Sequence, residues 1–425
     1  MELNSLPPPF ETTCDTCGKA AVITTYFQCV IYICPSCGES YRFRDNRLQK
    51  NNFTVKEEKG ESQYVPIGAF GKINNRTYKV TGFAVKREQG TRYYWREYLL
   101  FNPYNGYAFL SEYDGHWIFL EQLIIHPKEV VIPHDLAFDR KWFRFYSKYK
   151  AAFVYARGEF CYDVLNDTPT NVEELISPPY MLSREKSIDE QMWFYGQYLQ
   201  RDDVKSIFSL REDPPEQTGI GMCQPMKASF NFSTLIKLTA IFLGVLIALQ
   251  VFMGYRARNT QVLSDFYTLQ TDSAGNLMPV VTRSFEIKDG PTNLEMEFLA
   301  GVDNSWMEFS ADLVNETTGQ HVGLNSTIQY YYGYDGGESW SEGSTHSTAV
   351  LSQLPSGKYH LNIWPSRERA QTNGFTLNAV SSFPMYSNMF LAAGIIVLYP
   401  IIIHLRRQRF ERRRWSNSNY SPYDE

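Results

Sequence analysis

The chain has 425 residues, of which 43% are hydrophobic and 20% are charged. This balance excludes a mostly disordered chain, and the length predicts two to four domains. The formal net charge of −5 gives no whole-chain reason to expect nucleic-acid binding. Because aromatic residues make up 15% of the chain and favour strands, we expect more sheet than helix.

Four of the cysteines form two Cys-x-x-Cys pairs, Cys14 with Cys17 and Cys34 with Cys37, and a glycine follows each pair. A Cys-x-x-Cys turn directs two thiolates at one point, and two such turns complete a tetrahedral metal site. The pattern predicts a zinc ribbon over residues 10–45. The Zn²⁺ ion would be structural, because four thiolates leave no open coordination position. The alternative interpretation is a pair of redox disulfides.

The segment after the cysteines, residues 60–210, predicts a β-rich domain. The turn dipeptides Asn105-Gly106 and Asp114-Gly115 separate aromatic-rich runs, which indicates a three-strand meander. A polar linker is expected over residues 45–63, ahead of this domain. A helix is expected over 188–199, because the residues before it fit a capping box, Ser187 with Glu190.

Several residues of this segment occur in the order found in a known family. They are Gly68, Gly71, Tyr78–Gly82, Trp95–Leu100, Trp117, Gly158–Glu159, Ser177–Glu185 and Glu190–Tyr198. Over roughly residues 60–210 the chain resembles the bacterial domain-of-unknown-function family 4178. The resemblance implies a β-rich domain that occurs beside membrane segments and zinc ribbons. It implies no catalytic residue.

Two apolar segments, residues 235–254 and 385–405, are each about long enough to cross a ~30 Å hydrocarbon core. Neither contains Asp, Glu or Arg, which favours simple anchors in contact with membrane lipid over an ion pathway. The alternative interpretation of each is a buried core helix. Residues 211–234 are predicted to form a Pro/Gly-rich linker to the first segment.

The membrane orientation follows from a run of arginines in the basic tail, residues 406–425. Arginine-rich flanks stay in the cytoplasm, so both termini are expected there, with residues 255–384 external or periplasmic. The cysteines agree, because all precede residue 224 and zinc thiolates belong in a reducing compartment. Together with the bacterial family resemblance, this predicts the inner (cytoplasmic) membrane.

Between the apolar segments, regularly spaced strands and turn signals over residues 280–383 predict a jelly-roll-like β-sandwich. Residues 255–279 are expected to form a stalk, whose first part continues the preceding helix. The run Tyr330–Tyr334 with Trp340 suggests an aromatic face for stacking on sugars.

Three carboxylates in the same region, Asp335, Glu338 and Glu342, suggest a calcium loop. The favoured interpretation is that the tyrosines are ordinary strand residues and that the carboxylates lie in a solvated loop.

Glu97 is the best single candidate for a catalytic residue, because it would share a strand face with Tyr93 and Trp95. The favoured alternative is a Glu97 side chain that is paired with a nearby arginine or lies at the rim of a barrel. No P-loop, Gly-x-Ser-x-Gly or His-Glu-x-x-His motif is present, and no catalytic residue is assigned.

These patterns predict a mainly β, multidomain membrane protein, with a zinc ribbon, a β-rich cytoplasmic domain, and two transmembrane helices flanking an external sandwich. The favoured function is a non-enzymatic membrane-anchored adaptor or sensor. Its expected partners are membrane lipid, other membrane or cytoplasmic proteins, and an external carbohydrate or peptide ligand, but not nucleic acid. The alternatives are an enzyme acting on a small metabolite through the β-rich domain, and a purely structural subunit of a membrane complex.

Overall fold

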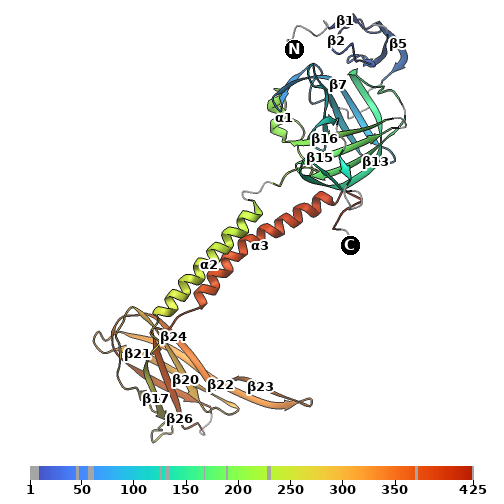
Figure 1. The fold of residues 1–425 in the computed structure, drawn as a ribbon. Coiled ribbons are helices and arrows are strands. Elements are labelled where there is room, and N and C mark those ends of the chain that lie inside the picture. Colours follow the sequence, from blue (N-terminus) through green and yellow to red (C-terminus); the bar gives the residue numbers. More distant parts are fainter. Residues whose placement is uncertain are drawn as a thin grey trace. The chain divides into compact units, whose positions relative to one another are not determined.

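The computed structural model describes residues 9–44, 47–55, 62–124, 127–129, 135–166, 168–187, 190–226, 231–368 and 372–423 (Figure 1). The chain divides into two compact units. The first comprises Met1–Ser229 and Ile403–Glu425, and the second comprises Phe230–Ile402. Strands dominate both units, which confirms the mainly β prediction.

Within the described part of the first unit, eight antiparallel strands close into a barrel, since β13 pairs with both β14 and β7. Their order around the barrel is β7 (Arg76–Glu88), β8 (Tyr94–Asn102), β9 (Gly106–Tyr113), β10 (His116–Leu123), β16 (Gln191–Leu199), β15 (Tyr180–Lys186), β14 (Thr170–Ser177) and β13 (Lys141–Phe160). The predicted meander is confirmed as β8, β9 and β10. Asp114 and Gly115 form the tight turn, with φ angles of 49° and 79°.

The cysteine-containing segment joins the barrel through one shared strand. The hairpin β1 (Phe10–Thr13) and β2 (Ala20–Ile23) precedes β3 (Ile31–Ile33), β4 (Glu39–Arg44) and β5 (Arg47–Thr54). Strand β3 pairs with the end of β13, so β3, β4 and β5 extend the barrel's own sheet, whereas β1 and β2 form a separate two-stranded sheet. The predicted linker over 45–63 is wrong at β5, which pairs with β4.

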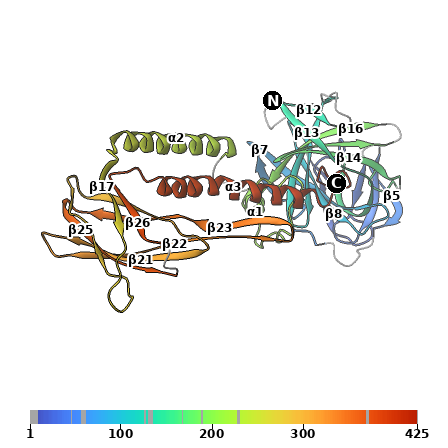
Figure 2. The ribbon, with the colours of Figure 1, turned by 90° about the horizontal axis from the view of Figure 1, so that it is seen from below.

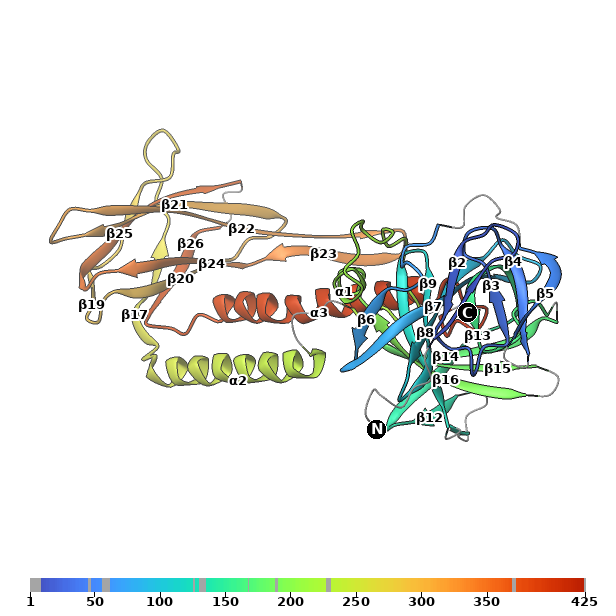
Figure 3. The same cartoon turned by 90° about the horizontal axis from the view of Figure 1, so that it is seen from above.

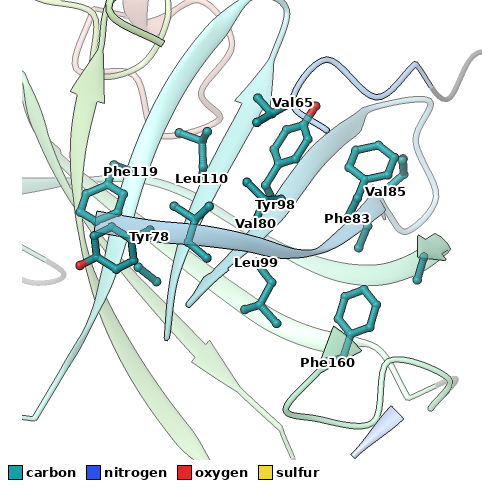
Figure 4. Close-up of a cluster of buried hydrophobic side chains, with 14 of the residues drawn as sticks. Val65, Tyr78, Val80, Phe83, Val85, Tyr98, Leu99, Leu110, Phe119 and Phe160 are labelled. Atoms are coloured by element: carbon teal, nitrogen blue, oxygen red, sulfur yellow. The ribbon is translucent and has the colours of Figure 1, made fainter. Parts of the chain in front are cut away.

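Short elements complete the first unit: β6 (Phe70–Ile73), β11 (Lys128–Glu129), β12 (Leu136–Phe138) and α1 (Arg201–Ile207). Its main hydrophobic cluster lies on both sides of the sheet at β7. Figure 4 shows Val65 and Phe83 on one side of this strand, with Leu99 and Phe160 on the other. Burial on both faces stabilises the closed sheet.

The helix expected over 188–199 is wrong for the described residues, because Gln191–Leu199 form β16. The capping-box residues are instead part of the turn between β15 and β16. There the Glu190 amide donates to the Ser187 hydroxyl over 3.2 Å. The same local hydrogen bond serves a helix start or a tight turn, so the barrel partners β10 and β15 decide the outcome.

The second unit contains two long apolar helices, α2 (Phe232–Arg256) and the first part of α3 (Ser387–Trp415). Both are long and apolar enough to cross a membrane. They lie side by side in this unit (Figure 2), and the Gln250 side chain donates to the Met385 carbonyl.

Two sheets form the rest of the second unit. One contains β17 (Thr260–Thr268), β26 (Gly374–Ser381), β20 (Thr292–Ala300) and β24 (His346–Leu354). The other contains β18 (Val280–Val281), β19 (Phe285–Ile287), β25 (Gly357–Arg367), β21 (Ser305–Asn315), β22 (His321–Asp335) and β23 (Glu338–Ser344). A common core joins them, with Phe298 and Phe309 ring centroids 4.7 Å apart. Figure 3 shows β22 and β23 as a long hairpin.

The expected stalk helix is wrong, because residues 260–268 form β17. This strand pairs with β26 and belongs to the sandwich. Polar and apolar residues alternate only weakly in this strand, with Val262, Ser264 and Phe266 on one face and Leu263 and Asp265 on the other. The partner strand β26 lies far along the chain, so local sequence does not indicate the pairing.

Candidate functional site

The four predicted metal-binding cysteines come together in the structure. The Sγ atoms of Cys14, Cys17, Cys34 and Cys37 all lie within 4.8 Å of one another. The Cys14–Cys37 and Cys17–Cys34 sulfur distances are 3.5 and 3.8 Å. With Zn–S bonds of ~2.3 Å, sulfurs at the corners of a tetrahedron lie roughly 3.8 Å apart. The spacing fits a zinc ion, and none of the four cysteines is in a disulfide.

Local backbone geometry positions these thiols. Gly18 donates to the Cys14 carbonyl over 2.8 Å, and Gly38 donates to the Cys34 carbonyl over 3.0 Å. Both glycines have positive φ, 68° and 77°, which a side chain would strain. The two Cys-x-x-Cys-Gly sequences therefore fold as equivalent turns that face each other.

The environment of the cluster favours a thiolate at Cys14. Burial by itself raises the pKa of this thiol. The Tyr41 hydroxyl, 3.3 Å from Sγ, and the backbone amides of Cys17 and Thr16 outweigh burial and lower the pKa to about 6. The pKa of Cys37 is raised to about 12, chiefly by burial. A metal ligand must be deprotonated, and the surroundings of Cys14 favour that form.

A second candidate site is the interior of the barrel, a cavity of about 1530 Å³. Alternate residues of the strands line it, as the period of two requires. On β9 they are Tyr107, Phe109, Ser111 and Tyr113.

Glu97 lies in this cavity and is paired with a lysine. Its carboxylate is 2.8 Å from the Lys86 ammonium and accepts a 3.0 Å hydrogen bond from the Trp95 indole. The ammonium is also 3.5 Å from Glu185 and 5.0 Å from the centre of the Phe153 ring. The expected arginine partner of Glu97 is wrong, because the cation beside its carboxylate is Lys86.

Burial and the attraction between opposite charges have opposing effects on the pKa values of Lys86 and Glu185. Burial by itself lowers the pKa of Lys86, but attraction to Glu185 and Glu97 raises it above its ordinary value. Burial also raises the pKa of Glu185, against the attraction of Lys86. Lys86 is therefore held as a cation inside the barrel.

A third interior carboxylate, Glu174, has neutral partners. It accepts hydrogen bonds from the Ser147 and Tyr149 hydroxyls over 2.6 and 2.9 Å. Burial raises its pKa, and the two hydroxyls oppose the shift. Sequence analysis missed Lys86, Glu174 and Glu185. The sequence does place a charged residue at one of the alternating positions of each of the strands that carry them. That pattern indicates an interior site only if the strands are known to close into a barrel.

Two distant segments pack together on this barrel. One is residues 216–224, ahead of α2, where the Thr218 carbonyl lies 3.1 Å from His116 Nε2. The other is the end of α3 and the tail after it. The Arg414 side chain is 1% exposed and donates to the carbonyls of Met222 and Gln224 over 2.7 and 2.8 Å.

The tail is also fixed to the barrel strand β13. Tyr146 donates to the Arg414 carbonyl over 2.9 Å, and its ring lies 5.2 Å from that of Trp415. Ser416, Asn417 and Asn419 then line the barrel cavity. The predicted linker and basic tail therefore contribute to the candidate site.

The other predicted features of the sandwich do not assemble as sites. Trp340 pairs with Gly333 and packs against it, on the opposite face of the hairpin from Tyr330, Tyr332 and Tyr334. A single face with all these rings is therefore not formed. Apart from the cysteine cluster, no group of three or more potential metal ligands gathers among the described residues, so the proposed calcium loop is not assembled.

Comparison with known proteins supports the family resemblance. Residues 66–201 match the model of the Domain of unknown function (DUF4178). This match covers all eight barrel strands, including those that carry Lys86, Glu97, Glu174 and Glu185. The cysteine cluster and both long apolar helices lie outside it.

Other comparisons add no functional information. No curated protein matches the chain. Among solved structures, infectious bursal disease virus Gx strain is 11% identical, with 88% of this chain and 69% of that chain covered and a TM-score of 0.17. A Bombyx mori beta-fructofuranosidase is 11% identical, with 89% and 77% covered and a TM-score of 0.16. Likenesses this weak carry no argument about fold or function.

Proposed function

We propose that this chain is a non-enzymatic, membrane-anchored sensor or adaptor of the bacterial inner membrane. In this proposal α2 and the apolar part of α3 cross the bilayer, and the barrel unit lies in the cytoplasm with both termini. The sandwich would then be external or periplasmic. The length and apolar character of the helices, and the arginines that end α3, support this arrangement.

The observation that carries the proposal is the joint packing of residues 216–224 and the end of α3 on the barrel unit. The first segment leads to α2, and Arg414 and Trp415 end α3. Each apolar helix is thus connected by a short stretch of chain to the same part of the first unit. The proposal requires that a change at either helix be passed to these contacts of the first unit.

The cysteine cluster would hold a structural Zn²⁺ in this proposal. All four ligand positions are thiols, so no position is left for a substrate. The β1–β5 segment buries a small cluster of its own around these cysteines, and metal binding would supply much of its folding energy.

The adaptor role is tested by purification of the full chain from native cells in mild detergent, with bound proteins identified by mass spectrometry. We expect a reproducible, stoichiometric partner. The Arg414→Ala variant should lose or weaken that partner, whereas the neighbouring Arg413→Ala variant should keep it. Recovery of a folded, zinc-loaded chain without any partner would contradict the adaptor proposal and leave the purely structural alternative without support as well.

The membrane arrangement has a separate test. A cysteine placed at Ser339, on the β23 hairpin, should react with a membrane-impermeant maleimide in intact spheroplasts. A cysteine at the exposed Ser416 should react only after the membrane is opened. The reverse labelling pattern would overturn the orientation.

The enzyme alternative is supported by one observation, the Glu97–Lys86 pair inside a cavity. An acid and a base in contact can exchange protons with a bound metabolite. The Glu97→Gln variant separates the proposals. Loss of cellular function in a chain that still folds and still binds its partner would favour chemistry. Retention of function would exclude Glu97 as a catalytic group.

A further inference from the structure

We propose that the barrel interior is a binding site for a small organic cation, such as an alkylammonium, held between carboxylates and aromatic rings. This inference goes beyond the sensor or adaptor proposal, because it names a ligand class for the barrel unit. It stands whether or not the chain binds a partner protein.

The first support is the cavity itself. An eight-stranded barrel is wide enough to enclose one small ligand when its interior is not filled by side chains. The volume of about 1530 Å³ exceeds the roughly 300–1,000 Å³ of an ordinary small-molecule pocket. The space therefore accommodates an organic molecule as well as water.

The second support is the charge of the lining. Three basic residues line the cavity, Arg76, Lys86 and Lys148. Eight acidic residues line it, namely Glu88, Glu97, Asp114, Glu121, Asp163, Glu174, Glu185 and Glu190. Arg76 pairs with Glu121, Asp163 pairs with Arg42 from outside the lining, and Lys148 pairs with Glu173 on the outside of β14. Six of the acidic residues and Lys86 are left after these pairs. The interior therefore favours a cation over an anion.

The third support is that one carboxylate lacks a counter-charge. Glu174 is 8% exposed and forms hydrogen bonds with two neutral hydroxyls, and no ion pair to it is formed within the described residues. Isolated buried carboxylates are costly. A ligand cation would supply the missing charge.

The fourth support is the aromatic lining, which suits an organic cation better than a hydrated metal ion. Trp95 packs edge-on against Tyr149 at 5.5 Å, and Phe109 against Phe194 at 5.5 Å. Ring faces attract ammonium groups. The Lys86 ammonium already occupies such a place, between two carboxylates and the Phe153 ring. The chain's own side chain thus shows how the interior holds an alkylammonium.

Cation binding should be linked to proton release. Burial raises the pKa of Glu174, and the nearby carboxylates of Glu185 and Glu88 raise it further. Burial also raises the pKa of Glu185, and the carboxylate of Glu97 adds to that shift. Lys86 opposes the shift at Glu185. A bound cation would favour the ionised forms, so affinity should increase as the pH rises through the range in which these carboxyls lose their protons.

Isothermal titration of the purified full chain in mild detergent tests the proposal. The probes are choline and butylammonium, with 3,3-dimethyl-1-butanol as the neutral isostere of choline. We expect saturable binding of at least one cation at pH 8, weaker binding at lower pH, and no binding of the alcohol. Absence of saturable binding for both cations, or equal binding of the alcohol, would overturn the proposal.

Matched variants locate the site. The Glu174→Gln variant should weaken binding of the cation at least tenfold. The Glu173→Gln variant changes the next residue, outside the cavity, and should leave the affinity unchanged. If the Glu174→Gln variant fails to fold, the Trp95→Leu variant tests the aromatic lining of the cavity instead. It should also weaken binding of the cation at least tenfold. Partner recovery from native cells is measured independently, so failure of this inference and failure of the adaptor proposal give different results.

Discussion

The guanidinium of Arg414 donates a hydrogen bond to the main-chain carbonyl of Met222 over 2.7 Å. The two residues are far apart in sequence, at the end of α3 and ahead of α2. Arg414 also pairs with Glu411 at 3.0 Å. A planar guanidinium with several fixed donors suits such a set of acceptors, and lysine could not satisfy the same geometry. This contact holds the tail beside the barrel cavity.

The Arg414→Ala variant should release the tail. The variant leaves the Met222 and Gln224 carbonyls without this donor, and an unsatisfied buried acceptor typically costs about 1–3 kcal/mol, whereas Glu411 is 27% exposed and stays solvated. We expect faster amide hydrogen exchange over residues 415–420 in the full chain. The Arg413→Ala variant, at an exposed neighbour, should change stability by less than about 0.5 kcal/mol. Unchanged exchange in both variants would show that the tail is held by other contacts.

Glu159 on β13 should stabilise the contact between the barrel and the cysteine-containing segment β1–β5. It is 5% exposed, and its carboxylate accepts from the Thr24 amide at 3.0 Å and from the Thr25 amide and hydroxyl at 2.7 Å. Glu159→Ala leaves buried donors without acceptors, so we expect a loss of about 2–4 kcal/mol. Glu159→Gln keeps one acceptor oxygen and should cost less. Denaturant titration of the full chain measures both, and equal costs would contradict this account.

Local signals in the sequence were enough to predict several features. The two Cys-x-x-Cys-Gly turns, the Asp114-Gly115 hairpin and the apolar helices each depend on residues close together in the chain. The barrel depends on pairing between β7 and β13, which lie far apart in sequence. Closure of the barrel places Lys86 beside Glu185, so this part of the candidate site was not predictable from local patterns.

Non-local pairing also explains the wrong elements. The strands β5, β16 and β17 have polar or ambiguous patterns and acquire their conformation from neighbouring strands. Likewise, the register of β22 and β23, which separates Trp340 from Tyr332, cannot be inferred from composition.

The cysteine cluster predicts one zinc ion per chain. Elemental analysis of the purified chain should give this ratio, and Cys34→Ser should abolish it. Cys161→Ser should retain it, because Cys161 is outside the cluster. Removal of zinc by a chelator should increase hydrogen exchange in β1–β4 before it affects the barrel, since the metal would stabilise mainly this small segment. A zinc-free chain with full protection of β1–β4 would contradict a structural metal.

Packing of residues 216–224 on the barrel should depend on pH through His116. This residue is 6% exposed, with Nδ1 2.9 Å from the Tyr198 hydroxyl and Nε2 3.1 Å from the Thr218 carbonyl. Burial lowers the pKa of His116, while the Thr218 carbonyl, Asp114 and Glu112 oppose the shift.

Because the pKa of His116 in the folded state lies below that in the unfolded state, the unfolded chain binds the proton more readily. The stabilising contribution is complete above the ordinary histidine value of about 6.5 and is lost as the pH falls below it. We therefore expect less protection of residues 216–224 at pH 5.5 than at pH 7.5, after correction for intrinsic exchange rates. The His116→Gln variant should show a smaller difference between the two pH values. An equal difference in both chains would assign the pH dependence to other groups.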